Sequence, residues 1–454
     1  TSVDNQFLAA EKPGLPLHIG GMAFFDGTPI LNRRGHVRLE AVRALVAGHL
    51  HLVPRFRRKL LVAPFGTGLP YWVDAPQFDV AEHVRAVSLP KGGTAADAWD
   101  LATDVMREPL PRDRPLWEMV FIDRLPDNRV LLVDKIHHAL VDGVSGAESL
   151  AVLLDPDPAA GIPEARSWTP APPPAPAALL SGIAADMLRL PRSLGQAALD
   201  PRSSVEGARR RIGHLEALVR QSRFAPVTSL NQRVGTARRY LPLRQSLDVV
   251  KRIGHSHGTK VNDVVLAAVT SGLRALLEKR GELESVPELQ VLVPVSLRAD
   301  SQRLSLGNQV SSMLARLPVG EPDPVARLRR IVSHMDALKS SDEADGLAAI
   351  LDTAALLPSA LQDQISRTLV DHQNLVNLVV TNVPGPQMPL YLLGAEMQEV
   401  FPYVPLTGNL TVGIAILSYN GSLNLAVTAD PDTCPDAEVL VEGMRIGFDE
   451  LAAT

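Results

Sequence analysis

The chain is poor in several features that define common classes of protein. It has one cysteine, Cys434, in 454 residues, which excludes an intrachain disulfide and a cysteine-ligated zinc site. No run of residues approaches the ~20 consecutive apolar residues that a membrane-spanning helix needs. The first six residues lack both a basic stretch and an apolar core, so we expect no secretion signal. These absences predict a protein of a reducing compartment, the cytoplasm, that does not cross a membrane.

The charge and the length set further limits. With 45 Lys and Arg against 50 Asp and Glu, the net charge is −5, and no global basic field is present to attract nucleic acid. A chain of 454 residues suits two or three domains with sizeable cores. Residues 155–176 are rich in Pro and Ala, cannot form a core and are predicted to be an extended linker. We therefore divide the chain into residues 1–155, a linker with neighbouring helices over 156–224, and residues 225–454.

Periodicity and turn residues predict alternating helices and strands along most of the chain. Expected strands cover residues 17–25, 118–125, 129–136, 289–296, 309–317, 374–380, 410–419 and 423–428. Expected helices cover residues 39–50, 246–254, 260–280, 324–338, 347–369 and 435–451. The last two strands meet at Asn420-Gly421, a strong hairpin signal. This pattern indicates a mixed α/β protein.

Two adjacent histidines stand at the end of the predicted strand 129–136. His137 and His138 are followed, after three residues, by Asp142 and Gly143. This spacing should occur by chance in roughly one chain in a thousand of this composition. Since neighbouring strand residues point to opposite faces, only one of the two imidazoles can face a given cavity. An imidazole at a strand end is well placed to act as a general base near neutral pH.

Two other segments have simpler interpretations. The basic run from Arg55 to Lys59 is interpreted as a solvated surface rather than a phosphate site. An apolar stripe with nearby arginines includes Leu179, Leu180 and Ile183. It is predicted to pack on the body of the protein, and the alternative is a helix that lies in a lipid interface.

Several short motifs occur in a fixed order: Pro115-Leu116-Trp117, His137 to Gly143, Asn262-Asp263, Pro294 to Arg298, Leu306-Gly307-Asn308 and Thr381 to Pro386. The histidine motif alone resembles the wider superfamily that holds chloramphenicol acetyltransferase and peptide-synthetase condensation domains. Together, the ordered motifs resemble the bacterial wax ester synthase/diacylglycerol acyltransferase family. The family usually has Ser where this chain has Thr381, which keeps the hydroxyl and adds a methyl group.

The resemblance implies a fold and a reaction. The fold would have two chloramphenicol acetyltransferase-like domains, each a mixed sheet flanked by helices, with an active-site tunnel between them. Acyl-CoA would enter from one side, and diacylglycerol or a long-chain fatty alcohol from the other. No cofactor would be needed. The protein would be cytoplasmic and peripherally attached to a membrane or lipid inclusion.

The resemblance also suggests roles for individual residues. His138 would be the catalytic base and His137 a supporting neighbour. Asp142 would point away from the tunnel and pair with Arg298, bracing the turn that carries His138. Asn262 is the leading candidate for a donor to the thioester oxygen, where one well-placed donor contributes about 3–4 kcal/mol. Thr381 and Asn382 are further candidates for substrate positioning.

Three alternatives stay open at this point. The same chemistry could act on a polyketide or another secondary-metabolite acceptor. A metal hydrolase would use His137, His138 and Asp142 as ligands, although adjacent strand histidines diverge. A non-catalytic lipid-binding protein could keep the fold without the reaction.

Overall fold

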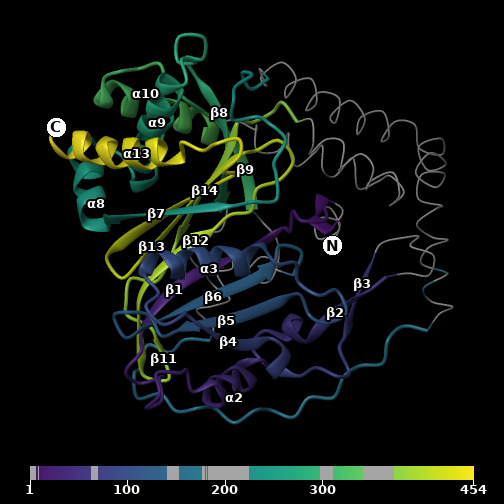
Figure 1. The fold of residues 1–454 in the computed structure, drawn as a ribbon. Coiled ribbons are helices and arrows are strands. Elements are labelled where there is room, and N and C mark those ends of the chain that lie inside the picture. The colour runs from purple at the N-terminus through teal and green to yellow at the C-terminus, as the bar shows by residue number, and fades with distance from the viewer. Residues whose placement is uncertain are drawn as a thin grey trace.

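The main body of the protein is built on two large sheets, one above the other in Figure 1. The figure draws a computed structural model, which describes residues 7, 8, 10–62, 70–140, 153–175, 179, 181, 224–296, 310–340 and 373–454. The strand order of one sheet is β11-β12-β1-β6-β5-β4, and that of the other is β7-β14-β13-β10-β8-β9. Both sheets are mixed, since β4 runs parallel to β5, and β10 runs parallel to β13 and β8. The expected two-part α/β architecture is therefore confirmed.

The first sheet has a helix on each face. Its strands from the N-terminal half are β1 (His18–Asp26), β4 (Val84–Ser88), β5 (Trp117–Asp123) and β6 (Arg129–His137). Alternate residues of β1 face opposite ways, as the pleat requires. Ala23 and Phe25 share a core with α2 (Leu39–His49), whereas Met22 and Phe24 share a core with α3 (Ala95–Arg107). The predicted hairpin of β5 and β6 forms, and it lies between β1 and the edge strand β4.

A small ribbon lies beside the first sheet. It consists of β2 (Arg58–Leu61) and β3 (Tyr71–Asp74), which pair antiparallel. Short 3-10 helices cover Pro54–Arg57 and Val80–Glu82. The ribbon, β4 and α3 were not among the elements expected from the sequence.

The second sheet has a layer of helices on one side (Figure 1). Its strands are β7 (Arg239–Ser246), β8 (Leu289–Ser296), β9 (Val310–Leu317), β10 (Leu378–Pro384), β13 (Val412–Tyr419) and β14 (Ser422–Ala429). The helices are α8 (Leu247–Ser256), α9 (Val261–Lys279), α10 (Pro324–Ser340) and α13 (Ala437–Ala452). At Gly272 of α9, an added Cβ would lie 2.3 Å from the carbonyl oxygen of Leu440 in α13. The close packing of these two helices therefore requires glycine there.

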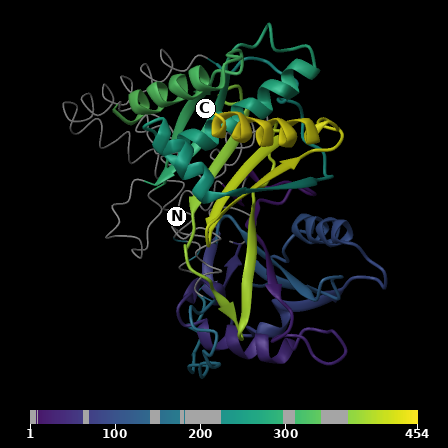
Figure 2. The same ribbon diagram turned by 90° about the vertical axis from the view of Figure 1, so that its left-hand side faces the viewer.

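The two halves are joined by strands that cross between them. β11 (Tyr391–Leu392) and β12 (Ala395–Tyr403) follow β10 in the chain but belong to the first sheet, where β12 pairs with β1. Figure 2 shows these yellow-green strands extending from the upper half into the lower one. The predicted division into residues 1–155 and 225–454 places these strands in the second part, whereas their hydrogen bonds place them in the first sheet. Long-range strand pairing of this kind leaves no mark in local composition.

The described part of the linker runs over the surface of the first half. Residues 158–175 contain no helix or strand, as the Pro/Ala composition predicts. The backbone N–H of Ala171 donates to Asp74 Oδ2 at 2.9 Å. The guanidinium of Arg57 lies over the ring of Trp168, 5.1 Å from its centre. Among the described residues, no helix is both long enough and apolar enough to span a bilayer.

Candidate active site

The histidine turn is fixed by backbone hydrogen bonds to neighbouring segments. The N–H of His137 donates to the carbonyl of Leu116, and the N–H of His138 donates to the carbonyl of Leu17, both at 2.9 Å. The N–H of Leu140 closes the turn on the carbonyl of His137 at 2.9 Å. The end of β6 is thereby held from both sides, by the residues that precede β1 and β5.

The two histidines have different surroundings. His137 is 1% exposed, and its Nδ1 accepts a hydrogen bond from the N–H of Ala139 at 3.0 Å. Burial, with the nearby Arg112 cation as a second cause, lowers the pKa of His137 to about 3. His138 is partly exposed, and its ring stacks on Phe7 with 3.7 Å between ring centres. Only His138 of the pair therefore combines position at the turn with access from outside.

Arginine from the basic segment also contacts this turn. Arg55 Nη1 donates to the carbonyl of Leu140 at 3.2 Å, and its guanidinium lies over Trp72. Arg57 is only 9% exposed. The interpretation of residues 55–59 as a solvated surface is therefore wrong for Arg57, which tertiary neighbours cover, whereas Arg55 is partly exposed.

Two of the predicted positioning residues meet in the second half. The side-chain Nδ2 of Asn382, in β10, donates to Oδ1 of Asn262, in the first turn of α9, at 3.0 Å. The neighbouring Asp263 caps this helix, since its Oδ2 accepts from the N–H of Lys260 at 3.2 Å and from Thr259 Oγ1 at 2.7 Å. The amide of Asn262 is therefore not needed for capping.

Thr381 lies one residue before Asn382 in β10. Strand alternation places its side chain on the face opposite Asn382. Val380 and Leu378, which share the face of Asn382, belong to the core beneath the helices. The structure thus brings Asn262 and Asn382 together and leaves Thr381 on the other side of the strand.

Three predicted residues, Asp142, Gly143 and Arg298, lie outside the described residues. The pairing of Asp142 with Arg298 stays a prediction, and so does the metal hypothesis that includes Asp142. Within the described ranges, no group of three or more His, Cys, Asp and Glu side chains is placed to hold a metal ion.

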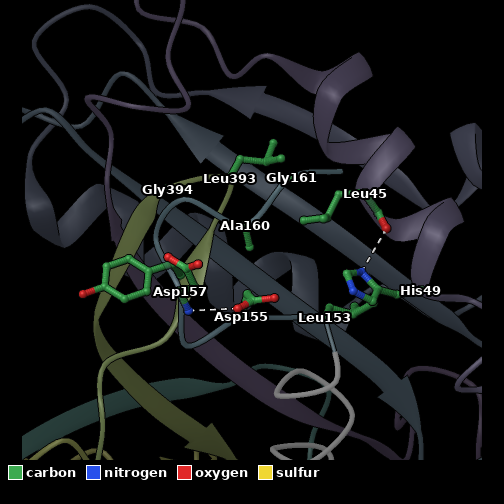
Figure 3. Close-up of a pocket in the computed structure, with 10 residues that line it drawn as sticks. Leu45, His49, Leu153, Asp155, Asp157, Ala160, Gly161, Leu393 and Gly394 are labelled. Atoms are coloured by element: carbon green, nitrogen blue, oxygen red, sulfur yellow. Dashed lines mark hydrogen bonds between the residues drawn. The ribbon is translucent and has the colours of Figure 1, made fainter. Parts of the chain in front are cut away.

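A small pocket lies where α2 approaches residues 153–161 and β11. Figure 3 shows Leu393 and Gly394 on one side of it and Leu45 and His49 on the other, and Tyr391 also lines it. In this view His49 is bonded to the carbonyl of Leu45, at 3.1 Å. None of the site residues predicted from the sequence lines this pocket. We therefore do not assign the reaction to it.

Comparison with known proteins gives a consistent result over the whole chain. Residues 1–265 match the family model described as the wax ester synthase/diacylglycerol acyltransferase catalytic domain, and residues 306–452 match the WS/DGAT C-terminal domain. A probable diacylglycerol O-acyltransferase of Mycobacterium tuberculosis, tgs1, is 30% identical over 100% of this chain and 95% of its own length. A putative diacylglycerol O-acyltransferase of the same organism is 32% identical over 99% of this chain and 94% of its own.

Solved structures agree on the fold. A wax ester synthase/diacylglycerol acyltransferase from Marinobacter aquaeolei VT8 superposes with a TM-score of 0.70 at 23% identity, covering 100% of this chain and 99% of that one. The first condensation domain of the CDA synthetase superposes with a TM-score of 0.56 at 17% identity, covering 100% and 95%. The chain therefore belongs to the wax ester synthase/diacylglycerol acyltransferase family and is an acyltransferase.

Proposed function

We propose that the protein transfers an acyl group from acyl-CoA to the hydroxyl of diacylglycerol or of a long-chain fatty alcohol. The observation that carries this proposal is the turn at the end of β6, where His138 is partly exposed and His137 is buried. Family membership and the names of the mycobacterial relatives favour diacylglycerol as the acceptor. The product would then be triacylglycerol, or a wax ester when a fatty alcohol is used.

His138 would act as the general base. A neutral imidazole removes the hydroxyl proton as the alcohol oxygen bonds to the thioester carbon. The C–S bond then breaks, and the same proton passes to the leaving CoA thiolate. Binding both substrates beside one imidazole makes the reaction effectively intramolecular. Transfer is direct, because the single cysteine, Cys434, is buried against Arg280 and outside the predicted site.

Asn262 would stabilise the negative charge that develops on the thioester oxygen. Its Oδ1 already accepts from Asn382, which leaves its Nδ2 group to donate elsewhere. The bond to Asn382 fixes which end of the amide points away from β10. A donor oriented before the reaction needs no reorganisation as charge appears.

Asp142 would support the turn rather than the chemistry. The family resemblance pairs it with Arg298, so that its carboxylate braces the loop after His138. Gly143 would complete that turn. These roles rest on the sequence motif alone.

The central test uses purified protein with palmitoyl-CoA and a panel of alcohols, with thiol release and lipid products as the two readouts. We expect triacylglycerol from diacylglycerol, formed about 100- to 10,000-fold more slowly by the His138→Ala variant. Products only from polyketide-like alcohols would favour the same reaction on another acceptor. Lipid binding without thiol release would favour a non-catalytic protein.

We also propose that the protein works in the cytoplasm and attaches peripherally to a membrane or lipid inclusion. Both lipid substrates are insoluble, and the apolar stripe from Leu179 to Leu188 has nearby arginines. Within this stripe, the described Leu179 is buried, with 6% exposure. Flotation with liposomes tests the idea on wild type, Leu180→Asp and Ile183→Asp. Equal flotation of all three proteins would remove this segment from the proposal.

A further inference from the structure

A short segment near the N-terminus reaches both histidines of the turn. The N–H of Glu11 donates to the carbonyl of Phe7 at 3.2 Å, which places these residues one helical turn apart. Phe7 stacks on the ring of His138, with an angle of 17° between the ring planes. Glu11 Oε1 lies 3.4 Å from Nε2 of His137. One element thus contacts the two imidazoles through different side chains.

Glu11 is itself held in place from two directions. Its Oε2 forms an ion pair with Arg112, and its Oε1 accepts from the N–H of Leu17 at 3.3 Å. The carbonyl of Leu17 in turn accepts the N–H of His138. Glu11 is therefore connected to the side chain of His137 and, through Leu17, to the main chain of His138.

The protonation of His137 follows from its partners. Burial lowers its pKa to about 3, so the ring is neutral near neutral pH. Because Nδ1 accepts from Ala139, the single ring proton resides on Nε2, which faces Glu11. The contact with Glu11 is therefore between a carboxylate and a neutral N–H, not an ion pair. Within the described part of the chain, Nε2 has no partner in hydrogen-bond geometry, so the 3.4 Å contact with Glu11 Oε1 is an electrostatic contact and not a formed hydrogen bond.

We propose that Glu11 is a positioning residue of the acyl transfer, which contacts His137 and holds Leu17, and thereby fixes the turn that presents His138. The inference rests on the proposed acyl transfer. Its mechanism needs an acceptor oxygen at the position of Glu11 Oε1, rather than a negative charge. Without that oxygen, the N–H of Leu17 loses its acceptor and the imidazole of His137 loses its contact with Glu11, so the turn that carries His138 is held less firmly.

Three substitutions of Glu11 distinguish a need for the acceptor oxygen from a need for the negative charge. Glu11→Gln keeps the length and the acceptor oxygen but loses the charge. Glu11→Asp keeps the charge but is one methylene too short to reach His137. Glu11→Ala loses both. We expect kcat to fall on the order of 100-fold in Glu11→Ala, because small misplacements of a catalytic group have effects of this size. Glu11→Asp should fall nearly as far, and Glu11→Gln should stay within about fivefold of wild type.

The KM for palmitoyl-CoA should stay within about twofold in all three variants, since Glu11 is not proposed to touch substrate. Glu399→Ala is the matched control: Glu399 is 21% exposed and pairs with Arg244, as Glu11, 13% exposed, pairs with Arg112. It should lower the melting temperature and leave kcat unchanged. If Glu11→Ala does not fold, the inference is still tested by whether Glu11→Gln has a higher kcat than Glu11→Asp.

Histidine-selective ¹⁵N NMR provides a second readout. In wild type and Glu11→Gln, His137 should show a protonated Nε2 and an unprotonated Nδ1; its signals are assigned by their loss in His137→Gln. The inference would be overturned if Glu11→Asp were as active as wild type. It would also be overturned if Glu11→Gln were as impaired as Glu11→Ala. Failure of the proposed function looks different, because wild type itself would then release no thiol from palmitoyl-CoA.

Discussion

Asn382 donates its side-chain amide to the side-chain oxygen of Asn262 at 3.0 Å, across the boundary between β10 and α9. The contact joins two residues that are 120 positions apart in the chain. Each was a separate candidate in the sequence, and the contact brings the two together. In the proposed reaction, Asn262 would offer its amide N–H₂ to the substrate and Asn382 would orient it.

The first prediction follows from this pair. Asn262→Ala should lower kcat about 100- to 1,000-fold, as expected when an oxyanion donor is lost. Asn382→Ala should have a smaller effect, since the donor itself remains. Asn231→Ala is the control, because Asn231 accepts from Asn377 at 2.7 Å in a similar pair elsewhere in the same half. Steady-state kinetics of the three variants measures these effects. A loss of kcat in Asn231→Ala as large as that in Asn262→Ala would contradict the role of Asn262 as oxyanion donor.

The second prediction separates the two histidines. His138→Ala should fold normally and lose about 100- to 10,000-fold in kcat, the range for a general acid–base group. His137→Ala should instead lose about 1–3 kcal/mol of stability, because the buried N–H of Ala139 loses its acceptor. Chemical denaturation and thiol-release kinetics measure the two effects side by side. Normal activity in His138→Ala would refute its role as base.

The third prediction concerns Asp142. If it braces the turn by pairing with Arg298, Asp142→Ala should lose on the order of 3–5 kcal/mol of stability along with activity, since one buried charge is left alone. Thermal unfolding and soluble yield are the measurements. A variant that melts like wild type but has no activity would instead indicate a direct catalytic role.

The fourth prediction is a pH dependence of stability. Asp134 lies on β6 between Leu132 and Ile136, is 0% exposed, and has no hydrogen-bond partner for either carboxylate oxygen among the described residues. Burial raises its pKa from 3.8 to about 8. Between these values the folded protein keeps a proton that the unfolded chain releases. This group therefore lowers the stability of the fold progressively as the pH rises from about 4 to about 8.

Asp134→Asn removes that titration while keeping the shape of the side chain. The variant should gain stability relative to wild type as the pH rises from 5 to 8, with no further gain above pH 8. Urea denaturation at several pH values measures the difference. The buried His18 and His137 also titrate on unfolding, but they are present in both proteins and cancel. A difference that does not change with pH would show that Asp134 is ionised in the fold.

The sequence predicted strands and turns well where residue periodicity or turn residues within the segment specify them. The strand at residues 289–296 was expected with the same bounds that β8 has. The hairpin at Asn420-Gly421 forms with both residues at positive φ, 43° and 79°, which these two residue types accept readily. In contrast, α3 was missed although Thr94 and Asp97 form a capping box at its start.

The sequence by itself determined that a histidine pair ends a strand and that helices and strands alternate, because hydrogen bonds and side-chain periods within a segment depend on nearby residues. It could not determine that β12 joins β1, or that His137 is buried while His138 is partly exposed. It gave no sign that Glu11 would meet His137, or that Asn382 would meet Asn262. Those relationships depend on how distant segments pack together, and only the tertiary structure decides them.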